Sequence, residues 1–394
     1  MILKNVLKIL DKNSKILIVL IWLFSTLLYI KLFGLVTNME AIKYIDEARL
    51  FIEKGTFSVP RYWFYSITIF IITVALKLKI GLTGAFILQA ILNLYAYLFF
   101  YTALKKAFQL PLTAFFIIAY LLIFWPYQNW VVYLFTESAF FSLILILFST
   151  LILYKPESFK NILLICIALV LVIMSRPLGI LFGGSIYLYL FYSANKKWKI
   201  VLGCASLFFL AFFFYTANTI FSTTKYWTIT QAFEQESVIC DLPTTTPSFT
   251  KLDLAISGNP VYQLCYYLTH NFSHFLHLAG IKLQYFFLMT RPFYSKAHNY
   301  FLLLNTIPLY LLMIGSFFIK RIPFNKEVAL FLISSIALYT IIIIIQCDDY
   351  QNRFILSIYP FFVVLAARTI EYLILHFFKN YKQTARIDIE KPVL

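Results

Sequence analysis

Apolar runs of about 20 residues recur along this 394-residue chain, and no other feature constrains its fold as much. A helix needs about 20 consecutive apolar residues to cross the hydrocarbon core of a bilayer, because each residue advances it by about 1.5 Å. Such runs lie near 15–36, 84–104, 111–128, 137–154, 161–176, 178–194, 200–222, 300–319, 327–346 and 354–374. They predict an all-α fold, a polytopic bundle of transmembrane helices with about ten spans.

The composition agrees with a membrane protein and excludes most soluble classes. Hydrophobic residues make up 61% of the chain and charged residues 13%, whereas soluble domains average about 45–50% and about 25%. So few charges cannot cover the surface of a soluble enzyme, and a disordered protein or a small disulfide scaffold is excluded as well. The net charge of +16 alone would suit a nucleic-acid partner. The lysines and arginines gather in short loops between apolar runs, however, so no nucleic acid is expected as a partner.

Lysine and arginine also predict the orientation, since they accumulate in the cytoplasmic loops of membrane proteins. Two stretches, near 63–80 and 275–290, are ambiguous as spans. If neither crosses, every short basic loop falls on one side; if both cross, the clusters at 105–106, 155–160 and 196–199 move to the other side. We therefore expect a multi-pass protein with both termini in the cytoplasm. The first stretch then lies on or dips into the outer face, and the second is amphipathic rather than spanning.

This topology divides the chain into three consecutive parts. Residues 1–222 form an N-terminal transmembrane module with a first outer loop at 37–83 and a second outer, acidic motif near 126–138. Residues 223–299 form a large outer loop with amphipathic helices, and residues 300–394 form the C-terminal transmembrane helices and a basic cytoplasmic tail. The sequence has no glycine-rich phosphate loop, zinc-ligand spacing, GxSxG motif or internal repeat.

Adjacent carboxylates in the first outer loop are candidates for catalysis. The loop is expected to form a short helix after Asn38 that stops at Gly55. Asp46 and Glu47 would point about 100° apart on that helix. One of them can therefore face a cavity while the other pairs with Lys43. A solvated acidic helix is the alternative.

In the second outer segment, Glu137 stands in the expected first turn of a helix, where the helix dipole favours an anion. Thr136 is expected to cap that helix. This local role is a full structural explanation for Glu137. The functional alternative is that its carboxylate lines a polar cavity on the outer side, and polar neighbours are expected in either case.

Three arginines stand at the outer ends of apolar stretches: Arg176, Arg291 and Arg353. Guanidinium groups at such positions can hold a phosphate through two parallel hydrogen bonds. The alternative is that each arginine pairs with a nearby acid. Arg353, for example, has Asp348 and Asp349 close by in sequence.

The large outer loop is rich in aromatic residues and histidines. Tyr262, His270 and His298 are candidates for sugar binding, although aromatic residues also form the interface belt of membrane proteins. On one continuous helix His270, His274 and His277 would share a face. No further ligand is fixed by spacing, so a divalent metal stays open and no metal ligand is assigned.

The chain has five cysteines. Cys166 and Cys204 fall in apolar runs, where a buried and inert thiol is expected. If the outer side is oxidising, Cys240 and Cys265 could pair across the large loop. Two free thiols are the alternative.

The order of these motifs resembles the GT-C superfamily, membrane glycosyltransferases that use polyprenyl-phosphate-linked sugars. The bacterial relatives of protein O-mannosyltransferases and the aminoarabinose transferase are the most similar branches. Asp46-Glu47-Ala48, with Gly55 downstream, is similar to the acidic motif in the first outer loop of the family. Glu137, which follows Pro126, is similar to its second acidic position.

Two basic motifs extend the resemblance to about residue 375. Arg176-Pro177-Leu178-Gly179 resembles a family element that follows a later span. Arg353-Phe354, with Pro360 downstream, resembles an Arg-Tyr motif that opens a late span. In the family, the stretch after the first outer loop lies along the membrane, which agrees with the reading of 63–80 from charge.

The resemblance implies a GT-C-like enzyme of the bacterial inner membrane whose active site faces the periplasm. It would move a sugar from a polyprenyl-phosphate donor to a hydroxyl of a glycan, lipid or protein acceptor in the cell envelope, with inversion at the anomeric carbon. Asp46 would be the general base, with Glu47 beside it and Glu137 orienting it or the acceptor. Arg353, Arg176 and Arg291 would hold the donor phosphate.

Two other functions remain open from the sequence. An O-antigen ligase or polymerase would depend on arginines and histidines of the large loop rather than on Asp46. A transporter of lipid-linked glycans would usually carry internal repeats and charges at the bilayer midplane, and the acids of this chain lie instead at the ends of its apolar runs.

Overall fold

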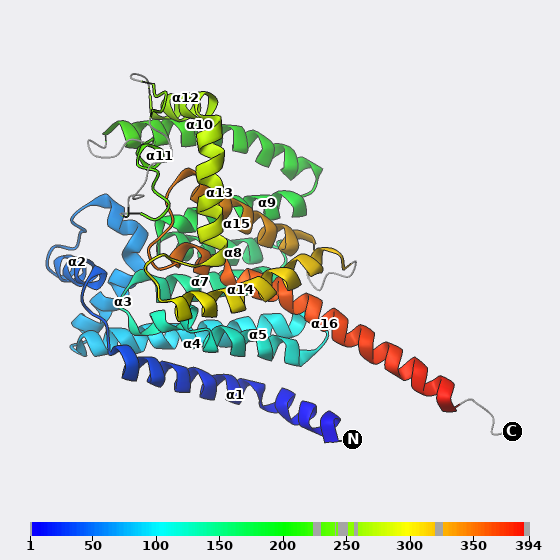
Figure 1. Ribbon diagram of the computed structural model, residues 1–394. Helices are drawn as coiled ribbons and strands as arrows, with labels where there is room; N and C mark the ends of the chain where they lie inside the picture. The colour runs from blue at the N-terminus through cyan, green and yellow to red at the C-terminus, as the bar shows by residue number, and fades with distance from the viewer. Residues whose placement is uncertain are drawn as a thin grey trace. The chain divides into compact units, whose positions relative to one another are not determined.

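The computed structural model describes residues 2–223, 230–240, 242, 251–255, 259–319 and 326–389, and the regular elements within them are helices (Figure 1). Each apolar run of the sequence coincides with a helix or a broken helix. These helices are α1 (Ile2–Phe33), α4 (Gly81–Ala107), α5 (Pro111–Ile123) with α6 (Trp125–Gln128), α7 (Thr136–Leu153), α8 (Phe159–Ile173), α9 (Ile180–Ser193), α10 (Lys196–Thr223), α14 (Lys296–Phe317), α15 (Lys326–Ile345) and α16 (Arg353–Ile389).

Six helices within the described residues are long and apolar enough to cross a membrane, or seven if one bent pair forms a single span. The six segments are Leu10–Phe33, Gly81–Ala107, Thr136–Leu153, Lys296–Phe317, Lys326–Ile345 and Arg353–Phe377. The chain is therefore a multi-pass helical membrane protein, as its apolar runs predicted. The number of full-length spans in this part of the chain is smaller than about ten, partly because α8 and α9 are apolar but short.

The run at 111–128 is broken rather than continuous. Helix α5 ends at Ile123, and the next helical segment, Trp125–Val132, is bent by 72° from it. Pro126 explains the break, because proline has no N–H to donate to the preceding turn and is tolerated only at the start of a helix. The bend places α6 and the 3₁₀ turn η2 (Asn129–Val132) directly before α7.

The stretch at 63–80 forms a turn and a short helix, η1 (Pro60–Tyr65) and α3 (Ser66–Lys77). Helix α3 has 12 residues, which corresponds to about 18 Å and is too short for a hydrocarbon core of about 30 Å. This length agrees with the prediction that 63–80 does not cross.

The chain forms two compact units that interleave in sequence. Unit 1 consists of Met1–Gly183, Leu309–Ala329 and Tyr359–Leu394, and unit 2 of Gly184–Pro308 and Leu330–Ile358. Helices α9, α14, α15 and α16 contribute residues to both. Each unit is described by itself below.

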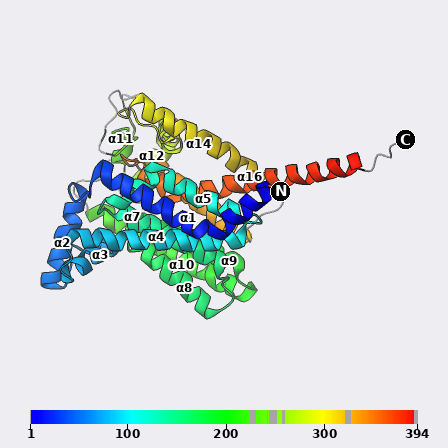
Figure 2. The ribbon, with the colours of Figure 1, turned by 90° about the horizontal axis from the view of Figure 1, so that it is seen from below.

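A polar network inside unit 1 fixes the broken segment to its neighbours. Helix α4 packs on α3 and α7, and α1 lies along α5 (Figure 1, Figure 2). Asn93 of α4 accepts hydrogen bonds from Trp22 Nε1 (2.8 Å) and Gln128 Nε2 (3.1 Å). Tyr97 donates to Gln128 Oε1 (2.7 Å), and Asn93 Nδ2 donates to Ser142 Oγ (3.3 Å). Because these polar groups satisfy one another, they can be buried between apolar helices.

Backbone pairing brings the loop after α1 and the segment before α7 together. Val36 N donates to Val132 O (2.9 Å), and Leu134 N donates to Val36 O (3.1 Å). Gln89 of α4 supports this parallel bridge by donating to Tyr133 O (2.8 Å). The start of the first outer loop is thereby held beside the start of α7.

In unit 2, the large loop contains α12 (Pro260–His270) and α13 (Phe272–Leu288), which are separate helices because the chain breaks at Asn271. The predicted single face with His270, His274 and His277 is therefore wrong. The two helices and the preceding segment enclose an apolar cluster of Phe233, Val238, Ile239, Tyr267 and Leu278.

The disulfide of the chain differs from the predicted pairing. Cys240 is bonded to Cys347, with 5.0 Å between their Cα atoms, and Cys265 is a free, exposed thiol. Cys166 and Cys204 are also exposed, which corrects the expectation that they are buried. The sequence placed Cys240 and Cys347 on one side of the membrane but did not show that backbone pairing brings them together.

Candidate functional site

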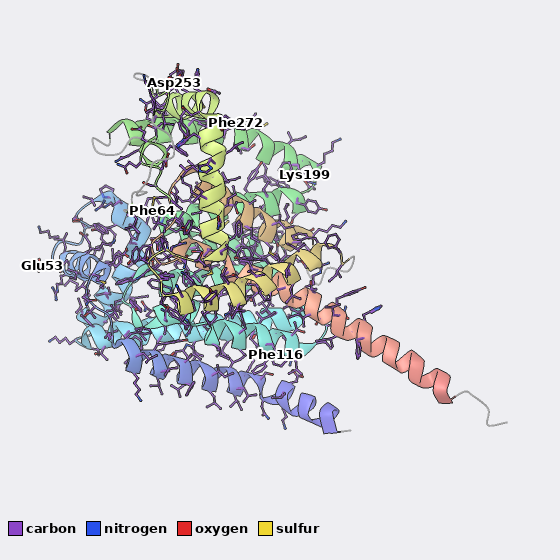
Figure 3. All side chains as sticks on the ribbon, viewed as in Figure 1. Glu53, Phe64, Phe116, Lys199, Asp253 and Phe272 are labelled. Carbon is purple, nitrogen blue, oxygen red and sulfur yellow. A yellow bond between two sulfur atoms is a disulfide. The ribbon has the colours of Figure 1, made fainter. Side chains whose placement is uncertain are left out.

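Helix α2 (Glu40–Lys54) carries the acids of the first outer loop. It begins near Asn38 and ends at Gly55, whose left-handed backbone (φ 71°) suits glycine, so the prediction for this helix is confirmed. Ala41, Tyr44 and Ala48 lie on its buried face. Figure 3 shows the side chains of the described residues, and Glu53 near the end of α2 projects outward.

The structure places the two predicted acids of α2 differently from the expectation. Asp46 lies on the exposed side, 61% accessible, and its Oδ1 is 3.3 Å from Arg49 Nη1. Glu47 is buried and accepts hydrogen bonds from the backbone N (3.0 Å) and the hydroxyl of Ser58. Glu47 thus ties α2 to the turn that follows it. The predicted Lys43–Glu47 pair is wrong, because Lys43 pairs with Glu40 one turn earlier (2.8 Å).

Glu40 is the carboxylate that sequence reasoning missed. It accepts a hydrogen bond from the Tyr44 hydroxyl (2.7 Å) as well as from Lys43, and 22% of its side chain is exposed. The sequence signal that could have identified Glu40 was its spacing along the helix. Glu40, Tyr44 and Ala48 are separated by four residues each, so they share a face, whereas Asp46 points elsewhere.

Glu137 is fully buried at the start of α7 and forms an ion pair with Arg176. The cap differs from the prediction, because α7 begins at Thr136 itself and Phe135 occupies the N-cap position without a side-chain hydrogen bond. Arg176 directly precedes η3 (Pro177–Gly179). Gly179 is required there, since a Cβ atom would lie 2.5 Å from Val172 O.

These residues form one electrostatic group, which we call the acid–tyrosine cluster: Glu40, Tyr44, Tyr65, Glu137 and Arg176. The rings of Tyr44 and Tyr65 are 5.7 Å apart. Burial raises the pKa of Tyr44, the negative charges of Glu40 and Glu137 raise it further, and Arg176 opposes them. Burial also raises the pKa of Tyr65, and Arg176 again acts in the opposite direction. The cluster therefore joins α2, η1, α7 and the segment after α8.

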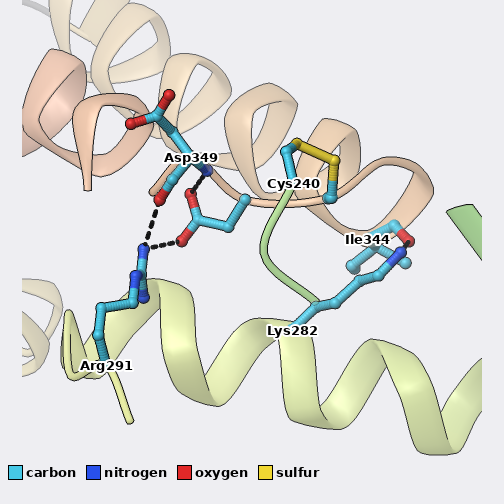
Figure 4. The surroundings of a disulfide bond; sticks show 7 residues. Cys240, Lys282, Arg291, Ile344 and Asp349 are labelled. Carbon is cyan, nitrogen blue, oxygen red and sulfur yellow. Dashed lines mark hydrogen bonds and ion pairs between the residues drawn. A yellow bond between two sulfur atoms is a disulfide. The ribbon is translucent and has the colours of Figure 1, made fainter. Parts of the chain in front are cut away.

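Arg291 in unit 2 is enclosed by protein acceptors. It is fully buried, and Nη2 donates to Asp348 Oδ2 (2.6 Å) and to Asp349 O (3.0 Å) (Figure 4). Its Nη1 donates to Tyr285 O (2.9 Å) and Thr290 O (3.1 Å). This arrangement is typical of a structural arginine and leaves no exposed donor for a phosphate.

Arg353, in contrast, begins α16 and stays partly accessible. Its Nε is 3.3 Å from Asp349 Oδ1, which is one of the two pairings expected from sequence. Aromatic side chains lie in the same part of unit 2. The ring of Tyr294 stacks on His298 with centroids 4.2 Å apart. Burial raises the pKa of Tyr294 to about 12, although Arg291 opposes this effect.

The other predicted sugar-binding residues lie on α12. Tyr262 is exposed, and exposed His270 stacks on Tyr266 with centroids 3.8 Å apart. His274 instead points inward, where Nδ1 lies 2.7 Å from the Tyr267 hydroxyl. Within the described residues, no group of three or more His, Cys, Asp or Glu side chains could hold a metal ion.

The predicted site residues thus separate into two sets. Asp46, Glu47, Glu137 and Arg176 belong to unit 1, and Arg291, Arg353, Tyr262, His270 and His298 belong to unit 2. The ion pair Glu137–Arg176 joins two of them directly. Comparisons with known protein families, curated proteins and solved structures found no match to this chain, so its function is argued from its own residues.

Proposed function

We propose that the chain is a membrane glycosyltransferase. It would move a sugar from a polyprenyl-phosphate donor to an acceptor hydroxyl on the outer side of a bacterial inner membrane, with inversion at the anomeric carbon. The observation that carries the proposal is the acid–tyrosine cluster, in which two carboxylates, two phenols and a guanidinium meet from segments far apart in sequence. The orientation follows from the basic loops, and a lipid-linked donor suits a compartment without nucleotide sugars.

Glu40 is the proposed general base. In the reaction, the acceptor oxygen bonds to the anomeric carbon, the bond from that carbon to the phosphate oxygen breaks, and the acceptor proton moves to the carboxylate. Glu40 is partly exposed and accepts hydrogen bonds from Tyr44 and Lys43. Asp46, the base expected from sequence, lies on the other side of α2 with Arg49, so Glu40 replaces it in the proposal.

Arg176 is the proposed cation for the leaving phosphate. The phosphate gains negative charge as its bond to the sugar breaks, and a fixed guanidinium stabilises that charge. Glu137 holds Arg176 from the buried side, while 11% of the arginine side chain stays exposed. Arg353, Tyr262, His270 and His298 belong to unit 2, and no role in this site is assigned to them. Arg291 is left out because its side chain is fully buried.

The test measures transfer from radiolabelled polyprenyl-phosphate sugars to envelope glycans and glycolipids in membranes that contain the protein. Loss of a general base typically costs about 10²–10⁴-fold in rate, and Glu40→Gln should lose activity by this factor. Asp46→Asn is the matched control on the same helix and should transfer within about twofold of the unmodified protein, since exposed ion pairs contribute little. Both variants are compared at equal amounts of folded protein.

The same assay separates the proposal from its alternatives. A ligase or polymerase would use a diphosphate-linked oligosaccharide, and a transporter would move a donor without breaking its sugar–phosphate bond. Full transfer by Glu40→Gln together with an inactive Asp46→Asn would return the base to Asp46. Absence of any transfer from monophosphate-linked sugars would reject the proposed function.

A further inference from the structure

Three segments of unit 2 that are distant in sequence meet at the disulfide. They are the loop segment at 238–240, the α13–α14 connector at 289–295 and the α15–α16 connector at 346–352. Cys240 N donates to Asp348 O (2.9 Å), and Asp348 N donates to Val238 O (2.8 Å). The Cys240–Cys347 bond lies beside this pairing and closes a sequence separation of 107 residues. We call this assembly the disulfide joint (Figure 4).

The joint also holds charged groups whose positions depend on it. Asp348 accepts from Arg291 Nη2 through one oxygen and from Asp349 N through the other (2.6 and 2.7 Å). Asp349 in turn pairs with Arg353 at the start of α16. Asp348, next to the disulfide, therefore contacts Arg291 directly and is linked to Arg353 through Asp349.

The backbone of the joint is strained on both sides of the buried ion pair. Met289 and Asn352 have φ angles of 60° and 62°, a region that residues other than glycine adopt only at a cost. Asn352 Nδ2 donates to Met289 O (2.8 Å), which links the two strained residues. Such conformations persist where the surrounding contacts enforce them, so loosening one contact favours release of the others.

The two sulfurs differ in their surroundings. Cys347 is buried, whereas Cys240 is only partly buried. A small dithiol attacks a disulfide at the sulfur that it can reach, and Cys240 is the more exposed residue of the two.

We propose that the Cys240–Cys347 disulfide is a redox latch. In the oxidised state it holds residues 230–240 on the α15–α16 connector. A dithiol reductant breaks the S–S bond, leaves two cysteine thiols and becomes a disulfide itself, so two electrons and two protons pass to the protein. The loop segment then separates from Asp348, and the contacts of Asp348 with Arg291 and Asp349 loosen. The inference does not depend on the proposed function.

Two neighbouring glutamates provide an internal readout of the latch. Glu236 is 6% exposed, whereas Glu234, two residues earlier, is exposed. Cleavage after these two residues can therefore be compared.

The full-length protein in nanodiscs is treated with a protease that cuts after glutamate, before and after mild dithiol reduction. Cleavage after Glu236 relative to Glu234 should rise by about 30-fold or more on reduction, because long-loop disulfides contribute strongly to stability. Reoxidation should reverse the change. Cys265→Ser is the matched control and should behave like the unmodified protein.

Several outcomes would overturn the latch. The first is the absence of a Cys240–Cys347 cross-linked peptide when the isolated protein is analysed by mass spectrometry. The bond could resist the dithiol until the protein is denatured, which would make it a permanent structural cross-link. The reduced protein could also be cut in the same ratio as the oxidised one. Reduction of the unmodified chain supplies this measurement, so the test does not depend on a cysteine variant that folds. None of these outcomes involves sugar transfer, so the proposed function is tested separately.

Discussion

Each unit contains a buried acid–arginine pair, and the two pairs differ in how completely they are enclosed. In unit 1 Glu137 is fully buried and Arg176 is 11% exposed. In unit 2 both Arg291 and Asp348 are fully buried. Both pairs lie near tyrosines and a second carboxylate, but Arg291 also donates to the backbone carbonyls of Tyr285, Thr290 and Asp349.

This difference indicates different roles for the same chemical pair. A guanidinium that is fully enclosed by the protein holds chain segments together and presents no donor to a ligand. A guanidinium with an accessible edge, beside groups that can exchange protons, can respond to a bound anion. The first description fits Arg291 and the second fits Arg176. The following predictions test this contrast, from the largest expected effect to the smallest.

The largest loss of stability is expected from Arg291→Met. It would leave the Asp348 carboxylate buried without its partner, and removal of one member of a buried pair typically costs about 3–5 kcal/mol. The folded fraction should be measured by thermal unfolding in detergent. The double variant Arg291→Met/Asp348→Leu should recover most of the loss, because no unpaired charge remains. A single variant as stable as the unmodified protein would contradict the structural role.

A second buried charge in unit 2 should make stability depend on pH. Lys282 of α13 is fully buried, and its Nζ lies 3.3 Å from Ile344 O (Figure 4). The same atom lies 4.7 Å from the centre of the Phe233 ring. Burial lowers its pKa from 10.5 to about 8. Between these values the unfolded chain binds more protons than the folded one, so stability should rise as pH increases from about 8 to about 10.5. Below about pH 8 the full cost of the buried charge is present.

Lys282→Met removes that cost and should raise stability at pH 7 by up to about 3 kcal/mol. It should also abolish the rise between pH 8 and 10.5 relative to the unmodified protein. Lys296→Met, at an exposed position of α14, is the matched control and should leave the rise intact. A Lys282→Met variant that melts earlier than the unmodified protein would show that the ammonium stabilises α15 through Ile344.

The smallest stability change of this series is expected in unit 1, from Glu137→Gln. The amide keeps the size of the side chain but removes the charge that faces Arg176, and a loss of about 1–3 kcal/mol is typical for a broken buried contact. Glu53→Gln, at an exposed position of α2, should change stability by less than about 0.5 kcal/mol. If Glu137→Gln proved as harmful to folding as Arg291→Met, the contrast between the two pairs would be lost.

Local sequence patterns predicted much of the helical architecture. Apolar length predicted where helices lie, because a membrane helix satisfies its backbone hydrogen bonds within one continuous segment. The same local logic predicted the end of α2 at Gly55, where the left-handed backbone suits a residue without a side chain. Charge counting predicted that 63–80 does not cross the membrane, and the short length of α3 agrees with this prediction.

Which side chains meet was decided by the tertiary structure. Asp46 and Glu47 are neighbours in sequence, yet one is exposed beside Arg49 and the other is buried against Ser58. Glu40 accepts a hydrogen bond from Tyr44 because α2 packs its Tyr44 face inward, and the four-residue spacing of Glu40, Tyr44 and Ala48 is the sequence signal for this face. Thr136 is not the N-cap of α7, because the helix begins at Thr136 and not after it.

For the disulfide and the arginines, too, the sequence did not determine which distant segments come into contact. The sequence left open which cysteine Cys240 pairs with, and the backbone pairing with Asp348 brings it to Cys347. Arg176 and Arg291 look equivalent in sequence, since each precedes a proline after an apolar stretch. Packing buries Arg291 completely and leaves Arg176 partly exposed. Helix formation depends on neighbours within a few residues, whereas burial and pairing depend on which distant segments reach the same place.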